Sequence, residues 1–281
     1  MRSSERKRTL QSKYKLRFGT LILNIAVFSV LLFLLLPAFI VIPMSFGSSE
    51  YLKFPPVDFS FKWYIDFFTN DLWIESLWLS LQVGVLTTLI ATVIGTLASL
   101  AMMRGCFPGK AIIHAIILSP MIIPVIIIAI AVYGLYAKLG LIGTRIGLVS
   151  AHTILAVPYV ILIVSANLDR FDLSLELAAM NLGANRLQTF FLVTLPLILT
   201  GVITSAIFAF ITSFDEIVVA NFISGIHGTT LPKRMFDGIR LEVSPLVASV
   251  SSLLIVVSII TILTIQSLQK EEKSGKEPDK A

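Results

Sequence analysis

The feature that most constrains the fold of this chain is a series of long apolar stretches with almost no charged residues. Six occur, at about residues 19–44, 76–103, 112–137, 147–167, 197–222 and 245–268. A helix that crosses a hydrocarbon core about 30 Å thick needs roughly 20 mostly apolar residues. Only 14% of the residues are charged, whereas soluble domains carry about 25%. We therefore predict an all-α, polytopic membrane protein with six transmembrane helices and no separate soluble domain.

The N-terminus resembles a signal peptide only superficially. Seven Lys and Arg residues precede the first apolar stretch, as in the basic region of a signal. However, the stretch 19–44 is longer than the roughly 7–15 residues of a signal core, and no small-x-small cleavage site follows it. We expect an uncleaved membrane anchor.

The distribution of Lys and Arg predicts the orientation of the chain. Of the 22 Lys and Arg residues, 15 precede the first stretch, follow the sixth, or lie in the second-to-third and fourth-to-fifth connections. Because basic residues concentrate in cytoplasmic loops, both termini are expected in the cytoplasm. The net charge of +5 then reflects membrane orientation, and no nucleic-acid partner is predicted. The domains are a basic segment 1–18, a transmembrane domain 19–268 and a disordered cytoplasmic tail 269–281.

Prolines and glycines indicate where the transmembrane helices bend. Pro120 and Pro124 lie within the third stretch. They allow either a helix break at bilayer depth or a plain kink in a packed bundle, and we expect the kink. The turn 104–110 contains two glycines and a proline, so the second and third helices should pack as an antiparallel pair.

No catalytic or metal-binding pattern is present in the sequence. The segment Gly105 to Lys110 is the nearest approach to a phosphate-binding P-loop, but its glycine spacing is too short and no strand precedes it. Cys106 is the single cysteine and the three histidines are scattered, which excludes a disulfide framework. We predict no catalytic residue, no metal site and no cofactor on this chain, hence no enzyme. His152 is interpreted as a helix-to-helix hydrogen bond.

Two short signals follow the fifth stretch. Thr230 can cap a short helix in which Leu231, Met235 and Ile239 form one apolar stripe. We expect this amphipathic helix to lie outside the membrane. Ser244 can then serve as the N-cap of the sixth transmembrane helix, with a proline as the first helical residue.

The connection between the fourth and fifth stretches predicts a helix, a turn and a second helix at about residues 169–195. Asp172 or Ser174 can cap the first helix, and Gly183 suits the left-handed residue that ends it. One face of this helix carries small and apolar residues, namely Leu175, Ala178, Ala179 and Leu182. Alanines on that face would let another surface approach closely, so this segment is predicted to be a cytoplasmic docking site.

The second helix of this connection should continue into the fifth transmembrane helix. Asn185 and Gln188 have capping-box spacing. Pro196 then opens the next span, where its missing N–H group has no cost. We call residues 172–196 the elbow, and a push on the elbow would be transmitted into the bundle.

The elbow resembles the cytoplasmic signature of permease subunits of binding-protein-dependent ABC importers. That signature reads Glu-Ala-Ala, three residues, Gly, nine residues, Ile-x-Leu-Pro. With this spacing the chain matches at Ala178, Ala179, Gly183, Leu195 and Pro196. The resemblance implies that these residues, with Glu176, Leu177 and Leu182, couple the permease to an ATPase.

One position of the signature differs from the family. Leu177 stands where the family has its motif Glu, and Glu176 lies one residue earlier. A shift of one residue turns a side chain by about 100° around a helix. The salt bridge to the ATPase that the family pattern implies at position 177 is therefore in doubt.

The resemblance covers about residues 20–268 and is strongest toward the second permease of spermidine/putrescine-type importers, on residues 213–219, 231–232 and 243–245. It implies a type I importer bundle in the bacterial cytoplasmic (inner) membrane. The implied partners are a second permease, two copies of an ABC ATPase that bind ATP and Mg, and a periplasmic or lipid-anchored substrate-binding protein. Alternative solutes are ferric iron, thiamine, an opine or an aminophosphonate. An ion-coupled secondary transporter is a further alternative, but no convincing repeat relates residues 19–137 to 147–268.

Asp215 and Glu216 are the only acids within a predicted span. Ionisable groups in a bilayer cost about 2.5–3.5 kcal/mol each. At ~1.5 Å per residue, Asp215 lies roughly 27 Å along the fifth helix, toward the outer surface. We expect one of the two to line the path and attract a cationic solute. The alternatives are a place among the outer headgroups or a pairing with a base in the bundle.

Overall fold

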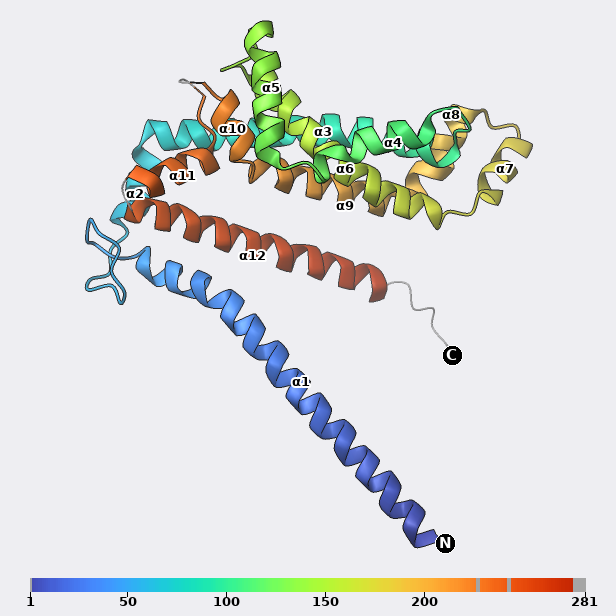
Figure 1. The fold of residues 1–281 in the computed structure, drawn as a ribbon, viewed down its shortest axis with the longest axis horizontal. Coiled ribbons are helices and arrows are strands. Elements are labelled where there is room, and N and C mark those ends of the chain that lie inside the picture. Colours follow the sequence, from blue (N-terminus) through green and yellow to red (C-terminus); the bar gives the residue numbers. More distant parts are fainter. Residues whose placement is uncertain (1, 226–227, 242–243, 275–281) are drawn as a thin grey trace. The chain divides into compact units, whose positions relative to one another are not determined.

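The structure, a computed structural model, describes residues 2–225, 228–241 and 244–274 (Figure 1). Within these ranges the regular elements are helices, and the backbone forms a single isolated bridge between Gly47 and Phe59. The predicted all-α class is confirmed. The chain divides into two compact units, Met1–Thr69 with Leu241–Ala281 and Asn70–Arg240.

The first unit contains α1 (Arg2–Met44), α2 (Lys62–Thr69) and α12 (Pro245–Ser274). Helix α12 packs against both α1 and α2, and the hydroxyl of Ser249 donates to the carbonyl of Trp63 at 3.3 Å. Pro37 and Pro43 lie inside α1 without ending it. The side chains of α1 from Thr20 to Leu36 are exposed, so their apolar surface is available to lipid or to a partner helix.

Aromatic side chains connect the end of α1 to the start of α2. The Tyr64 hydroxyl lies 2.5 Å from the Ser45 hydroxyl. The Phe46 ring lies 5.2 Å from the ring of Tyr64 and 5.4 Å from that of Phe61. The amide of Ser60 donates to the carbonyl of Phe46 at 2.7 Å. The connection between the two helices therefore folds back on itself.

The start of α12 follows the sequence prediction. Its first residue is Pro245, and Ser244 Oγ accepts from the amide of Leu246 at 3.3 Å. The helix continues to Ser274, so the backbone is helical in the first part of the predicted tail 269–281. The rest of that predicted tail, residues 275–281, lies outside the described residues.

The second unit contains the remaining elements: α3 (Asp71–Arg104), α4 (Lys110–Leu118), the 3₁₀ turn η1 (Ser119–Met121), α5 (Val125–Leu139), α6 (Arg145–Asp169), α7 (Ser174–Asn181), α8 (Arg186–Thr189), the π-helical turn η2 (Phe190–Thr194), α9 (Leu195–Phe214), α10 (Val218–Ile223) and α11 (Leu231–Leu241). Helices α3, α6 and α9 pack on one another and form its core, and α10 packs against α5 and α6.

Small and hydroxyl residues let the core helices approach closely. A Cβ atom at Gly95 of α3 would lie 2.5 Å from a methyl carbon of Val160 on α6. The hydroxyl of Ser99 donates to the carbonyl of Ile161 at 3.2 Å. Such contacts replace the hydrophobic driving force, which is missing between helices in lipid.

The interpretation of His152 is confirmed. Its Nδ1 lies 2.9 Å from Ser213 Oγ, which joins α6 to α9. The ring is buried.

Four helices among the described residues are long and apolar enough to cross a membrane: Thr20–Met44, Asp71–Arg104, Arg145–Asp169 and Arg186–Phe214. A bent pair, Lys110–Met121 with Val125–Leu139, and a shorter apolar helix, Pro245–Ile260, fall in the two other predicted stretches. Each of the six predicted apolar stretches thus contains helix, but the third is not one continuous helix.

The plain kink expected in the third stretch is wrong, because the helix breaks. The two halves are bent by 104°, and in Figure 1 α5 crosses the direction of α4. The break ends at Pro124, whose ψ of 130° is not helical. Proline lacks the N–H group and disfavours helical geometry in the residue before it. Two prolines four residues apart therefore end one helix and start another.

The predicted antiparallel pairing across the turn 104–110 is also wrong. Helix α3 packs against α6 and α9, whereas α4 makes contacts with η1 and α6. No residue of α4 is buried, although the turn itself is held by a 3.0 Å hydrogen bond from Lys110 Nζ to the carbonyl of Gly105. A short turn fixes where the next helix starts but not which helix it packs against.

The fifth predicted stretch, 197–222, is interrupted. Helix α9 ends at Phe214, and a separate short helix α10 starts at Val218. Glu216 Oε1 accepts from the amide of Val219 at 2.7 Å. The carboxylate thus satisfies a free N–H group at the start of α10, and its position marks the interruption.

Candidate functional site

Asp172 lies just before the first helix of the elbow, whose N-cap residue is Leu173. Asp172 Oδ1 accepts from the amide of Ser174, the first residue of α7, at 2.9 Å, and this hydrogen bond lowers the pKa of Asp172. Neither predicted residue is the N-cap, but Asp172 contributes a side-chain hydrogen bond to the first turn. Gly183 adopts the predicted left-handed conformation with φ of +95°, so the chain reverses there without steric conflict.

The second helix of the elbow continues into the membrane span as predicted. Asn185 and Gln188 form a capping box in which each side chain accepts from the other residue's amide at 2.9 Å. From Arg186 the helix runs through the π turn η2 into α9, where Leu195 is the first residue and Pro196 the second. No sequence pattern predicted the π turn. The backbone is thus continuously helical from the elbow to Phe214.

The elbow is an exposed apolar surface. Three leucines are largely exposed: Leu177 at 58%, Leu182 at 90% and Leu187 at 71%. Ala178 is exposed as well and Ala179 is half-buried. Several exposed apolar side chains within one short segment are typical of a protein interface.

Glu176, in contrast to the exposed leucines, faces the helix bundle. It is 9% exposed, and its Oε1 lies 2.6 Å from Nη2 of Arg104, the last residue of α3. The same oxygen accepts a hydrogen bond from the hydroxyl of Thr194 in η2. Sequence reasoning missed both partners, because they are 72 and 18 residues away from Glu176 in the chain.

The structure places the two predicted solute-path acids between α9 and α10 rather than within a span. Asp215 is exposed and forms the C-cap of α9, where its amide donates to the carbonyl of Ile211 at 3.0 Å. Glu216 is half-buried, and its carboxylate accepts from an amide in the first turn of α10. The two adjacent carboxylates thus have different surroundings.

A pocket of about 300 Å³ lies at the other end of α3 from the elbow. Its lining includes the charged side chains of Glu75, Arg145 and Arg234 and the polar side chain of Gln82. Neither predicted path acid lines it. Its volume is at the lower end of the range for small-molecule sites. Sequence reasoning missed these residues because they come from three separate segments.

Helix α11 forms part of this pocket wall. Arg234 Nε donates to Ser76 Oγ at 2.6 Å, and burial lowers the pKa of Arg234 although the charges of Glu75 and Asp237 raise it. The predicted helix is present, but the predicted cap is wrong. The buried hydroxyl of Thr230 has no hydrogen-bond partner in the described part of the chain.

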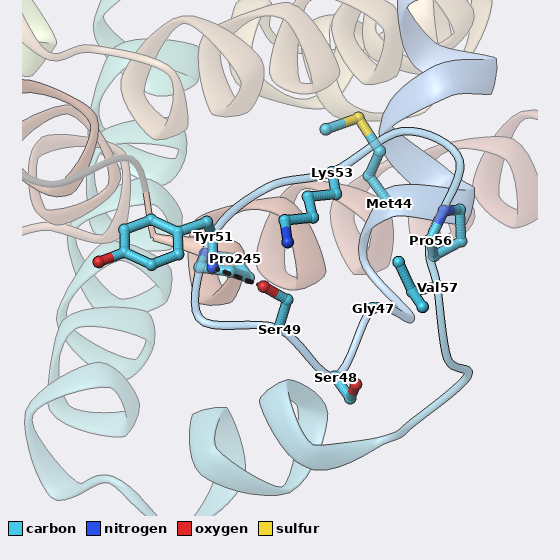
Figure 2. A pocket seen from close by; sticks show the side chains of 9 residues that line it. All are labelled: Met44, Gly47, Ser48, Ser49, Tyr51, Lys53, Pro56, Val57 and Pro245. Atoms are coloured by element: carbon cyan, nitrogen blue, oxygen red, sulfur yellow. Dashed lines mark hydrogen bonds between the residues drawn. The ribbon is translucent and has the colours of Figure 1, made fainter.

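The first unit holds a much smaller pocket beside the connection after α1 (Figure 2). Figure 2 shows Lys53, Tyr51 and Pro245 around it, and the amide of Tyr51 donates to Ser49 Oγ at 3.2 Å. Its volume is about 10 Å³, which suffices for about one water molecule. It is too small for an organic solute.

Comparisons with known proteins agree with the resemblance. Residues 91–270 match the family described as "Binding-protein-dependent transport system inner membrane component". The chain is 32% identical over 231 residues to the putrescine transport system permease protein PotI of Escherichia coli (strain K12), covering 79% of this chain and 82% of the relative. It is 30% identical over 236 residues to the spermidine/putrescine transport system permease protein PotC of Haemophilus influenzae, covering 84% and 91%.

A solved structure shows the same fold. A chain of a bacterial ABC transporter involved in the import of the acidic polysaccharide alginate superposes with a TM-score of 0.67 and 19% identity, over 90% of this chain and 96% of that chain. Together with the matched family and the polyamine permeases, this likeness identifies the chain. It belongs to the family of inner membrane components of binding-protein-dependent transport systems, as an ABC importer permease related to the polyamine permeases.

Proposed function

We propose that this permease forms half of an alternating-access path for a small cationic solute such as spermidine or putrescine. A separate ATPase would drive the path through the elbow. The observation that carries the proposal is the construction of the elbow. Exposed leucines lie on α7, at its C-cap and on the helix Arg186–Phe214, which continues into the membrane span α9.

The exposed leucines support docking of the ATPase at this surface. Leu182 and Leu187 would each bury most of their side chains against a partner, which stabilises a complex by about 25 cal/mol per Å² of apolar surface removed from water. Because helices transmit displacement along their axes, a movement of the docked elbow would displace α9.

The solute class rests on two supports. The printed names of PotI and PotC state putrescine and spermidine/putrescine transport for those proteins, and this chain carries Asp215 and Glu216 close to the outer end of α9. We assign one of these carboxylates to the attraction of a cation. Asp215 is the better candidate, since it is exposed whereas Glu216 is engaged by the amide of Val219.

The complete importer would contain a second permease, two ATPase subunits that bind ATP and Mg, and a substrate-binding protein on the outer side. The basic segment 1–18 and the tail 269–281 would both lie in the cytoplasm, as the positive-inside rule requires. The exposed apolar residues of α1 provide surface for lipid and for the second permease.

Reconstitution tests this function. The complete set of subunits is placed in proteoliposomes with ATP inside, and uptake of radiolabelled putrescine is measured with the binding protein outside. We expect uptake that stops when the P-loop lysine of the ATPase is replaced. Uptake by this chain alone, driven by an ion gradient, would instead establish a secondary transporter. ATP-driven uptake of ferric iron, thiamine, an opine or an aminophosphonate, but not of polyamines, would retain the importer and correct the solute.

A further inference from the structure

A single buried carboxylate joins the elbow to the bundle. Glu176 is the only buried residue of α7, a helix that is described in full. Its Oε1 contacts Nη2 of Arg104 at 2.6 Å and the hydroxyl of Thr194. One oxygen atom thus brings together the end of α3, the middle of α7 and the π turn that leads into α9.

Arg104 is itself well fixed for this contact. It is the last residue of α3, where the helix dipole favours a positive charge. Its guanidinium lies 5.6 Å from the centre of the Phe171 ring, in the segment that leads into α7. The side chain of Arg104 is 30% exposed and that of Glu176 is 11% exposed. A contact between a charged donor and a charged acceptor at this distance is among the stronger hydrogen bonds in proteins.

We propose that Arg104, Glu176 and Thr194 form a clamp that forces α3 and α9 to move together with α7. The clamp rests on the proposed role of the elbow as the ATPase docking site. In this assignment the acid next to the family's motif position serves inside the permease, and the three residues are positioning residues that do not touch the solute or the ATPase.

The clamp has a mechanical consequence because α7 has no other buried side chain. Without it, α7 would remain attached through the turn at Gly183 and through contacts with α8 and η2. A docked ATPase could then move α7 without moving α3. The core of α3, α6 and α9 would still fold, because its packing does not depend on Glu176.

The test compares variants of the complete complex in nanodiscs. Amide hydrogen exchange over residues 174–182 is measured in wild type, Glu176→Gln, Arg104→Gln and the double variant, together with ATP hydrolysed per solute molecule transported, with putrescine as the probe. Each single variant should exchange roughly fivefold to tenfold faster in this segment and hydrolyse more ATP per transport event. The double variant should resemble either single variant, since both break the same pair. Arg104→Lys should restore part of the wild-type behaviour.

Lys138→Gln is the matched control. It removes an exposed base at the end of α5, outside the elbow, and no ion pair is formed by Lys138 among the described residues. It should leave both measurements unchanged. The clamp would be overturned if Glu176→Gln kept both the wild-type amide exchange rate over residues 174–182 and the wild-type amount of ATP hydrolysed per solute molecule. Additive effects of the two substitutions in the double variant would overturn it as well. If the wild-type permease binds no ATPase, the proposed function fails, while the exchange comparison on the permease alone still tests the clamp.

Discussion

Glu176 and Leu177 are adjacent residues with opposite surroundings. The carboxylate is buried against Arg104 and Thr194, whereas the leucine is 58% exposed and lies on the proposed docking surface. Helical geometry turns neighbouring side chains about 100° apart, so one face of α7 can hold the bundle while another holds the partner. The position of an acid in this helix therefore decides whether it faces the bundle or the solvent.

Leu177→Glu introduces the motif acid at the exposed position. Because the new carboxylate would have no unfavourable burial in the free permease, we expect ATPase docking to stay intact or to strengthen. The measurement is the amount of ATPase that co-purifies with the permease in detergent, with Leu177→Ala as a control for loss of the leucine alone. Loss of the assembled complex in Leu177→Glu would contradict this expectation.

Asp215→Asn and Glu216→Gln separate the two candidate path acids. We expect Asp215→Asn to reduce putrescine uptake at unchanged membrane levels, because an exposed negative charge attracts the cation. Glu216→Gln keeps an oxygen that can accept from the amide of Val219, so α10 should remain folded and uptake should change less. Wild-type uptake by both variants would exclude these acids from the path.

Gly183 and Gly134 form a matched pair of sites for testing the conformation of the elbow turn. A Cβ would meet no atom within 4 Å at either residue, but only Gly183 has a positive φ. Gly183→Ala should therefore destabilise the elbow turn by about 1–2 kcal/mol, seen as faster amide exchange over residues 174–189 and less bound ATPase. Gly134→Ala, inside α5, should be neutral or stabilise its helix by about 0.5–1 kcal/mol. Equal effects of the two substitutions would show that φ is not the cause.

The close approach of α3 and α6 can be tested by a substitution at their contact. An alanine at position 95 would place its Cβ 2.5 Å from Val160, so Gly95→Ala should destabilise the core by about 1–3 kcal/mol through overpacking. Adding Val160→Ala should restore part of the loss. Thermal unfolding of the purified protein measures both, and equal melting temperatures for Gly95→Ala and wild type would contradict the close approach.

Sequence patterns predicted those elements whose signals are local. The capping box at Asn185, the left-handed Gly183 and the place of Pro196 in the first turn of α9 each depend on a few neighbouring residues, and all three are confirmed. The prolines of the third stretch were recognised, but a single sequence does not separate a kink from the 104° break. The partners of α3 and the contact between Arg104 and Glu176 depend on long-range packing, which no local pattern contains.

The whole molecule is a multi-pass protein of the bacterial inner membrane, as its family and its apolar helices indicate. Within the second unit, α3 separates two regions of different character. The elbow lies at its C-terminal end, and the 300 Å³ pocket lined by Glu75, Arg145 and Arg234 lies near its N-terminal end. With the elbow in the cytoplasm, as we propose, this pocket would lie toward the outer side of the membrane.

The single cysteine tests this orientation directly. Cys106 is exposed and lies in the turn after α3, two residues from Arg104. We expect a membrane-impermeant maleimide to leave Cys106 unlabelled in intact cells and to label it in inside-out vesicles. The reverse pattern is expected for Glu50→Cys in a Cys106→Ser background, because residue 50 follows the first span. Labelling of Cys106 in intact cells would invert the topology and exclude a cytoplasmic elbow.

The exposed leucines of the elbow also have a consequence for how long the protein persists in the cell. If an ATPase docks on the elbow as we propose, a copy synthesised without it would leave Leu182 and Leu187 in water at 90% and 71% exposure. Exposed apolar surfaces of this kind promote aggregation, binding by chaperones and degradation. Orphan copies should thus be short-lived, and a bacterium would need matched synthesis of the two subunits to accumulate either one.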